Sequence, residues 1–292
     1  MKDILLIGAT GQLGSSLLAG ASAGRIHAPN RDSLDVTDPQ SLLRCIEIYQ
    51  PRIIINTAAF HNLPQCEEQA DQAMEINCIA VYRLARLCAS CNIRLVTFST
   101  DYVFDGGQST PYVETDIPAP LQLYGISRLA GEHAALAAAP RHAYVVRTCG
   151  LYGERGAVSK GGNFVDKRVA DALQTDKLDV SSDQTVIPTY SADLAEAVIA
   201  LIDREGAESG IYHLVNQGQC TWAEFTSAIY EACGLTTVVN PVDRSGSSED
   251  MRRPSYSVIA NTRAAALGIV LPHWRDALMR YLTSKGFRKT TD

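Results

Sequence analysis

The sequence predicts a doubly wound α/β fold, in which a parallel sheet carries helices on both faces and a smaller α/β lobe follows it. Three observations support this fold class. Short apolar runs alternate with helical segments through the first 150 residues, which is the pattern of parallel strands joined by crossover helices. A glycine-rich turn follows the first run. After residue 150 the alternation loosens, and the chain of 292 residues is long enough for a second lobe.

The first five strands are predicted from apolar runs of the length typical of buried parallel strands. Between them lie four segments with helical periodicity. The second helix has the clearest start, because Asp38 can cap it and Pro39 suits its first position. The predicted strands are residues 3–8, 25–29, 52–59, 94–100 and 142–148. The predicted helices are residues 12–21, 38–50, 67–91 and 123–138.

The second half of the chain is predicted to contribute to both lobes. Residues 210–215 form one more strand, and the polar, proline-bearing segment 240–257 is predicted to be a loop. We expect residues 1–150 to form the first domain, with residues around 176–215 returning to it. The predicted helices of this half are residues 163–174, 191–203, 221–234 and 271–285.

The first turn of the chain indicates a phosphate-binding site. Gly8, Gly11 and Gly14 form a GxxGxxG pattern between a strand and a helix. Glycine lets the backbone approach a pyrophosphate closely, and the N-terminus of the helix presents free N–H groups to it. The pattern predicts that residues 1–150 are an NAD(P)-binding domain of the Rossmann type. The cofactor contacts expected in this turn are Gly8, Thr10, Gly11, Gln12, Leu13 and Gly14.

The end of the second strand bears on which dinucleotide binds. An acidic residue there would bind the ribose 2′-hydroxyl of NAD, whereas this chain has Arg31 after Pro29 and Asn30. Because a guanidinium suits the 2′-phosphate of NADP, NADPH is the expected cofactor and NADH is the alternative. Asp35 and Val36 are expected beside the adenine.

Polar side chains end two neighbouring strands, where the carboxyl ends of an open sheet form a ligand crevice. Residues 56–59 (NTAA) and 99–102 (STDY) stand at these ends. Tyr124 and Arg128 follow on the next helix, and a spacing of four places them on one face. A fixed cation favours the phenolate form of tyrosine, so Tyr124 can pass a proton to a carbonyl oxygen while a nicotinamide delivers hydride. Thr100 is expected to hydrogen-bond the same oxygen.

Together these motifs make the chain resemble the extended short-chain dehydrogenases/reductases and, more narrowly, the dTDP-4-dehydrorhamnose reductase family. The resemblance runs over nearly the whole chain. It implies NADPH-dependent reduction of the 4-keto group of a nucleotide-linked deoxysugar, giving dTDP-L-rhamnose. The segments that carry it are GATGQLG, NTAAF, EINCIAVYRLA with Asn77, STDYVFDG, the YxxxR spacing, VVRTCGLYG, DQTVIPTYSADLA and RRPSYSVIANTRAAALGIVLPHWRDAL.

The resemblance also implies roles for individual residues. The hydroxyl role falls on Thr100, proton donation on Tyr124, and the place of the family's lysine on Arg128. Residues 151–175 and 216–292 then form the expected substrate-binding lobe. The further cofactor contacts expected are Ala58, Ala59 and Ser99, beside Tyr124 and Arg128. The expected substrate-binding residues are His61, Asp101, Tyr102, Asn163 and, for the pyrophosphate, Arg253.

Three departures from the family pattern keep other functions open. Arg128 replaces a lysine, CGLYG at residues 149–153 stands where the family commonly has SWVYG, and HNLPQCEE with His61 replaces a TAVDKAE-like run. One alternative is another nucleotide-sugar reductase or an epimerase. A second is an NADP-binding regulatory subunit without catalysis, because the chain also resembles the regulatory β subunit of methionine adenosyltransferase.

Composition limits the expected partners and location. The formal net charge of −6, from 26 Lys and Arg against 32 Asp and Glu, disfavours nucleic acid and anionic membranes as partners. The N-terminus lacks a secretory pattern and no apolar run is long enough to span a bilayer, so a cytoplasmic location is expected. No metal-ligand spacing is recognisable, although the resembled family can use Mg²⁺. A homodimer is the default assembly.

Overall fold

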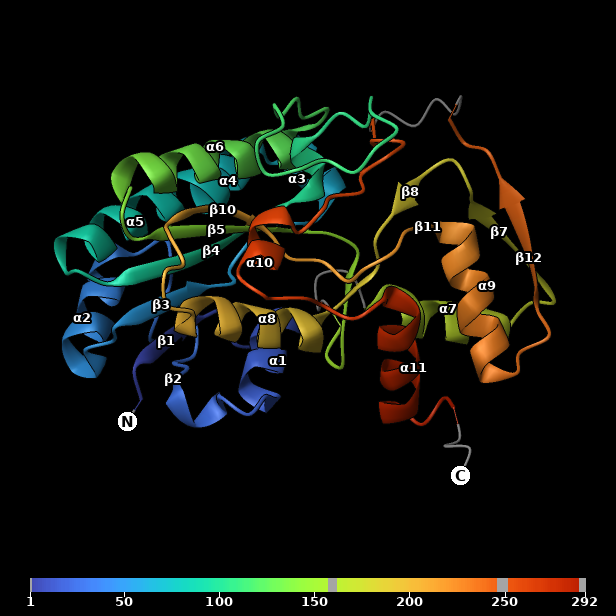
Figure 1. The fold of residues 1–292 in the computed structure, drawn as a ribbon, viewed down its shortest axis with the longest axis horizontal. Coiled ribbons are helices and arrows are strands. Elements are labelled where there is room, and N and C mark those ends of the chain that lie inside the picture. The colour runs from blue at the N-terminus through green and yellow to red at the C-terminus, as the bar shows by residue number, and fades with distance from the viewer. Residues whose placement is uncertain (1, 157–161, 246–251, 289–292) are drawn as a thin grey trace.

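The computed structural model describes residues 2–156, 162–245 and 252–288, and its main feature is a six-stranded parallel sheet (Figure 1). The strand order is β10-β5-β4-β3-β1-β2. All six strands predicted for this sheet are present, which confirms the doubly wound fold class. Their bounds are β1 (Ile4–Ile7), β2 (Ile26–His27), β3 (Ile53–Asn56), β4 (Arg94–Thr100), β5 (Ala143–Thr148) and β10 (Gly210–His213).

Both faces of the sheet are covered because its strands are apolar on both sides. In β1, Ile4 and Leu6 pack into one core, while Leu5 and Ile7 pack into the other. Such double burial is what a parallel sheet between helix layers requires. The first core is closed by α1 (Gln12–Ala19) and α8 (Ser191–Asp203). The second is closed by α2 (Pro39–Tyr49), α5 (Ala80–Ser90) and α6 (Leu123–Ala138).

Local signals set several helix ends as predicted. The Asp38 side chain caps α2 by accepting from the backbone N–H of Gln40 at 2.9 Å, and Pro39 opens the helix. The bounds of α6 are those predicted from the sequence. Caps of this kind depend only on neighbouring residues, which is why the sequence discloses them.

The segment predicted as one helix over 67–91 is interrupted, so that prediction was wrong in detail. A π-helical turn covers Glu75–Ile79, and the buried Asn77 within it bonds both backbone groups of Phe60 and the hydroxyl of Ser127. These long-range contacts coincide with the irregular turn, as is common for π-bulges. The helical pieces on either side are α3 (Leu63–Glu68), α4 (Ala70–Met74) and α5.

The smaller lobe, on the right in Figure 1, packs three helices around an aromatic core. They are α7 (Phe164–Ala172), α9 (Trp222–Cys233) and α11 (Trp274–Ser284). Strand β12 (Val238–Val242) pairs in parallel with β7 (Lys177–Ser181), so the loop predicted over 240–257 begins inside a strand. The return of the chain to the first domain, predicted from about residue 176, begins with α8.

Short strand pairs join the two lobes between the sheet and this small core. They are β6 (Leu151–Tyr152) with β9 (Thr189–Tyr190), and β8 (Thr185–Val186) with β11 (Cys220–Thr221). One short helix, α10 (Thr262–Ala266), packs near β10. The sequence pattern did not indicate these two-residue strands.

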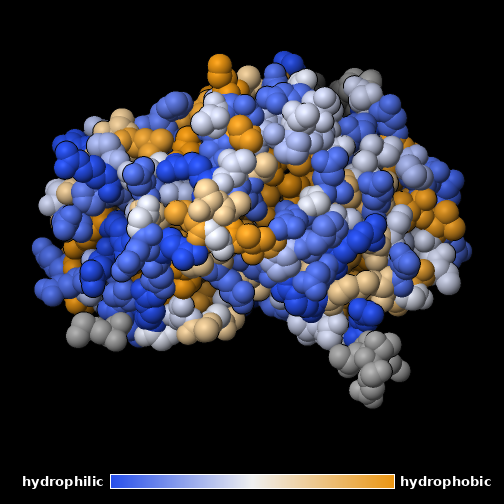
Figure 2. All heavy atoms as spheres, viewed as in Figure 1, coloured by the Kyte–Doolittle hydropathy of each residue, from blue (hydrophilic) through white to orange (hydrophobic). Residues whose placement is uncertain are grey.

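The face of the molecule in Figure 2 shows apolar side chains in separate groups among polar ones. Well-exposed apolar residues belong to different elements, as with Ile48 on α2, Leu173 after α7 and Val270 before α11. Within the described residues, no helix combines the length and apolarity needed to cross a membrane.

Candidate active site

The glycine turn forms a tight cradle at the start of α1. Gly8 has a φ of +83°, and a Cβ there would lie 2.5 Å from Thr57 Oγ1. A Cβ on Gly14 would lie 2.3 Å from the carbonyl oxygen of Gly8. The helix begins after Gly11 without any side chain capping it. Its first N–H groups are therefore left for an anion, as the pyrophosphate prediction requires.

The carboxyl edge of the sheet contains buried polar atoms with no hydrogen-bond partner. They lie at the ends of β3, β4 and β5 and at the starts of α1 and α6. In folded proteins such atoms are nearly always paired, so a group of them at one edge is suited to a polar ligand. These residues fit a dinucleotide crossing the strand ends. Among the described residues, the atoms at this edge are Gln12 Oε1, Asn56 Nδ2, Ser99 Oγ, Gln122 Nε2, Arg128 Nε and Thr148 Oγ1.

The loop after β2 presents the cation predicted to select NADP. The Arg31 side chain is 83% exposed, and its Nε lies 3.5 Å from Asp35 Oδ2. Asp35 accepts bonds from the backbone N–H and hydroxyl of Thr37, which hold the pKa of its carboxyl below the usual value. Val36 is buried in the core beneath. The guanidinium of Arg31 thus stands open to solvent beside a fixed loop.

The segment after β3 is held in place by its neighbours. Asn56 Oδ1 accepts from the N–H of Ala58 at 3.1 Å, and Phe60 is bonded to Asn77. Ala58 and Ala59 therefore follow the strand end in a fixed path. The half-buried His61 has its Nδ1 3.4 Å from the carbonyl oxygen of Ala59. Cofactor contact by these residues stays a prediction.

Thr100 and Asp101 form a buried pair at the end of β4. The Thr100 hydroxyl donates to Asp101 Oδ1 at 2.9 Å and accepts from the N–H of Tyr102 at 3.2 Å. Burial raises the pKa of the Asp101 carboxyl to about 6, although the nearby hydroxyls of Ser257 and Thr100 act in the opposite direction. The sequence placed both residues at the crevice but gave no sign of this bond.

Tyr124 and Arg128 lie together on α6, as their spacing predicts. The Arg128 Cζ is 5.7 Å from the centroid of the Tyr124 ring. Arg128 is 7% exposed. Within the described part of the chain, none of the hydrogen bonds or ion pairs involves its guanidinium. A buried cation whose N–H groups have no partner, next to a phenol, is suited to bind and polarise an oxygen atom of a ligand.

Tyr102 links this pair to the distant segment that contains Arg253. Its ring meets that of Tyr124 edge to face, with centroids 6.3 Å apart. Burial raises the pKa of the Tyr102 phenol and the negative charge of Asp101 adds to the rise, while the positive charge of Arg253 opposes it. Arg253 comes near because Pro254 packs on Gly106, where a Cβ would lie 2.8 Å from Pro254 Cβ.

Asn163 has a structural role that the sequence did not reveal. Its Oδ1 caps α7 by accepting from the N–H of Asp166, and its Nδ2 bonds Gly153, Asp166 and Tyr281. The side chain is buried. Its polar atoms are engaged within the protein, and contact with a substrate stays a prediction.

A second buried arginine lies behind the site. Arg147 forms a two-pronged ion pair with Glu132 of α6, through Nε at 2.9 Å and Nη2 at 2.6 Å. Its Nη1 lies 3.4 Å from His213 Nε2, and His213 Nδ1 lies 3.1 Å from the carbonyl oxygen of Ala260. Burial lowers the pKa of His213 to about 4. This cluster fixes α6, and with it Tyr124, against the sheet.

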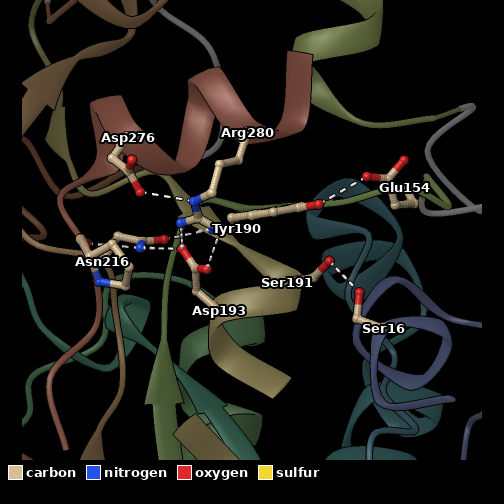
Figure 3. A network of polar contacts seen from close by, with 9 residues as sticks. Ser16, Glu154, Tyr190, Ser191, Asp193, Asn216, Asp276 and Arg280 are labelled. Carbon is tan, nitrogen blue, oxygen red and sulfur yellow. Dashed lines mark hydrogen bonds and ion pairs between the residues drawn. The ribbon is translucent and has the colours of Figure 1, made fainter. Parts of the chain in front are cut away.

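A polar network joins the two lobes (Figure 3). Asp193 on α8 receives two bonds from Arg280 on α11, at 2.7 and 2.8 Å, and one from Asn216 at 2.7 Å. On the same helix, Ser191 bonds Ser16 of α1 at 2.7 Å. We call these five residues the interlobe network. It connects the helix of the glycine turn to the small lobe.

Within the described residues, no group of three or more His, Cys, Asp or Glu side chains could hold a metal ion.

Comparison with known proteins gives consistent matches over nearly the whole chain. Residues 1–286 match the family model described as RmlD substrate binding domain. The dTDP-4-dehydrorhamnose reductase of Mycobacterium tuberculosis (strain ATCC 25618 / H37Rv) is 38% identical over 291 residues, covering 97% of this chain and 93% of the relative. The spore coat polysaccharide biosynthesis protein SpsK of Bacillus subtilis (strain 168) is 37% identical over 287 residues, covering 98% of each.

A solved structure shows the same fold. The crystal structure of dTDP-4-dehydrorhamnose reductase from Bacillus anthracis str. Ames, in complex with NADP, superposes with a TM-score of 0.90. It is 31% identical, and the match covers 97% of this chain and 100% of that one. The likeness extends over both the sheet and the smaller lobe.

Proposed function

The chain belongs to the RmlD substrate binding domain family, and we propose on this basis that it is an NADPH-dependent reductase of a nucleotide-linked 4-keto-deoxysugar. The expected reaction converts dTDP-4-dehydrorhamnose to dTDP-L-rhamnose. One observation in the fold carries the proposal: Tyr124 and the buried, unpaired Arg128 share a face of α6 beside a sheet edge with unpartnered polar atoms.

The chemistry assigned to the chain is proton transfer and charge stabilisation. Tyr124 donates a proton to the carbonyl oxygen as the carbonyl carbon becomes an alcohol. The positive charge of Arg128 stabilises the phenolate that remains. When bound, NADPH would supply the hydride for the carbon. One keto group, one NADPH and one proton would thus give one hydroxyl group and NADP⁺.

Residues around the crevice are suited to hold the two ligands. The Gly8–Gly14 turn and the open α1 N-terminus fit a pyrophosphate, and the exposed Arg31 fits the extra phosphate of NADPH. Tyr102 contacts the Tyr124 ring and interacts electrostatically with Arg253. Arg253 is therefore suited to the pyrophosphate of the nucleotide-sugar.

The proposal is tested with purified protein, NADPH and dTDP-4-dehydrorhamnose, following loss of the nicotinamide absorbance and identifying the sugar product. Tyr124→Phe removes the proton donor and should lower kcat by roughly 10²- to 10⁴-fold. The matched control is Tyr82→Phe, because Tyr82 is a 40% exposed phenol on α5. A full rate in Tyr124→Phe would contradict the assigned mechanism.

The same assay separates the alternatives. An epimerase would change the sugar without net loss of NADPH, and a reductase of another keto sugar would turn over only in a wider substrate panel. Binding of NADPH without turnover of any keto sugar, together with stable co-purification with a larger enzyme, would instead support a regulatory subunit. Arg128, Cys149 and His61 are the residues that motivate these comparisons.

The remaining proposals concern setting and assembly. A cytoplasmic location follows from the use of NADPH and a nucleotide-sugar. A homodimer is the default expectation for such an enzyme, and size measurement by light scattering tests it. Magnesium dependence is tested by adding a chelator to the assay.

A further inference from the structure

The bond between Thr100 and Asp101 conflicts with a direct role for Thr100 in carbonyl binding. A hydroxyl has one proton, and Thr100 gives it to Asp101 Oδ1 at 2.9 Å. A carbonyl oxygen can only accept hydrogen bonds. While Asp101 is an ionised carboxylate, which also only accepts, the Thr100 proton is held away from the substrate.

We propose that Asp101 is a positioning residue that controls the direction of the Thr100 hydroxyl, so that Thr100 donates to the substrate carbonyl only after Asp101 has taken up a proton. The inference rests on the proposed function. In this proposal Tyr124 remains the group that protonates the product. Asp101 only controls whether the Thr100 hydroxyl can hydrogen-bond the substrate carbonyl.

The valences of the two groups allow the switch. A protonated carboxyl carries one O–H, which can be donated to Thr100 Oγ1. That oxygen already accepts from the N–H of Tyr102 at 3.2 Å and has a second lone pair available. Thr100 then accepts two bonds and donates its own proton into the crevice.

The surroundings of Asp101 make its protonation accessible near neutral pH. Asp101 is 5% exposed, and no salt bridge of the described residues includes it. Burial places the pKa of its carboxyl at about 6. An anionic nucleotide-sugar nearby would favour protonation further. The titratable groups that interact with the Asp101 charge are Tyr102 and the Cys149 thiol. Tyr102 in turn interacts with Tyr124 and Arg253, and Arg128 lies beside the Tyr124 ring.

The first test is the pH dependence of kcat/KM between pH 5 and 8 in four proteins. For the wild type, kcat/KM should rise roughly three- to tenfold as pH falls through about 6, the worth of one neutral hydrogen bond. Thr100→Ser should keep the rise. Thr100→Val should lose it, because no hydroxyl remains to redirect.

Asp101→Asn is the decisive variant. Its amide has an N–H that can donate to Thr100 at every pH and no carboxyl that could take up a proton, so the profile should be flat between pH 5 and 8. It should fold, because a buried charge has been removed. If Asp101→Asn keeps the same rise as the wild type, or if Thr100→Val keeps it, the inference is wrong.

A second measurement does not depend on turnover. The infrared band of a protonated carboxyl should grow as pH falls through about 6 and be absent in Asp101→Asn. In Thr100→Val its midpoint should move up, because the bond that the ionised carboxylate loses is charge-assisted and stronger than the neutral bond that the protonated form loses. An unshifted midpoint overturns the coupling even where the reductase assay succeeds. Absence of any keto-sugar turnover, with the midpoint shifted, would instead refute the proposed function alone.

Discussion

Two buried arginines, Arg128 on α6 and Arg147 paired with a residue of α6, have different surroundings. Arg147 is 1% exposed, and the donors of its guanidinium have Glu132 and His213 as partners. Arg128, on α6 itself, is 7% exposed and has a buried Nε with no partner. Both charges are costly to bury. Only the first is compensated within the described protein.

The difference separates structure from function in this fold. Where a buried polar group is saturated by the protein, its removal should lower stability. Where it is left open at the sheet edge, its removal should lower activity and leave stability unchanged or higher. The interlobe network belongs with Arg147, and the crevice atoms belong with Arg128. The four predictions below test this division, from the largest expected effect to the smallest.

Arg147→Met should have the largest effect, because Glu132 would remain as a buried, unpaired carboxylate. We expect a loss of about 3–5 kcal/mol in the free energy of unfolding, measured with denaturant. Replacing the pair together, with Arg147→Met and Glu132→Leu, should restore much of this loss. A loss below about 1 kcal/mol in the single variant would show that the pair is not structural.

Acidification should break the same cluster through His213. Its pKa is about 4 in the folded protein and near 6.5 when unfolded, so the unfolded chain binds more protons between these values. Stability should therefore fall by roughly 2–3 kcal/mol as pH drops from 6.5 to 4. His213→Gln should lose this component, whereas the exposed His133→Gln should keep it. Equal acid sensitivity in all three proteins would contradict the assignment.

Arg128→Met tests the open arginine. We expect kcat/KM to fall roughly ten- to a hundredfold, the worth of a hydrogen bond to a charged group, with no loss in unfolding free energy. Arg128→Lys keeps the charge and should retain or raise activity. Equal rates in the three proteins would contradict the charge argument, and a destabilised Arg128→Met would place Arg128 with the saturated groups.

Arg280→Met should have the smallest effect. The Arg280 side chain is 42% exposed, so water can replace part of the hydrogen bonding that Asp193 loses. Asn216 still donates to the Asp193 carboxylate. We expect about 1–2 kcal/mol of lost unfolding free energy, with turnover per folded molecule unchanged. The exposed Arg275→Met on the same helix is the control. A fall in kcat without a fall in unfolding free energy would show that the interlobe network supports catalysis and not stability.

The sequence by itself determined the features that depend on near neighbours. The strands of the main sheet follow from apolar runs, the bounds of α6 from helical periodicity, and the pairing of Tyr124 with Arg128 from a spacing of four residues. The spacing of the glycine turn is also local, and Gly14 meets the backbone of Gly8 and Ala9, whereas the contact that requires Gly8 is with Thr57 after β3.

Only the tertiary structure decided which polar groups are satisfied. The sequence predicts that Asn163 contacts a ligand, but in the structure its side chain caps α7 and bonds Tyr281, 118 residues away. The π turn at Asn77, the strand β12 and the Arg147–Glu132 pair likewise depend on partners far along the chain. A hydrogen bond needs two atoms at a fixed distance, and sequence spacing fixes that distance only within a helical turn or a tight loop.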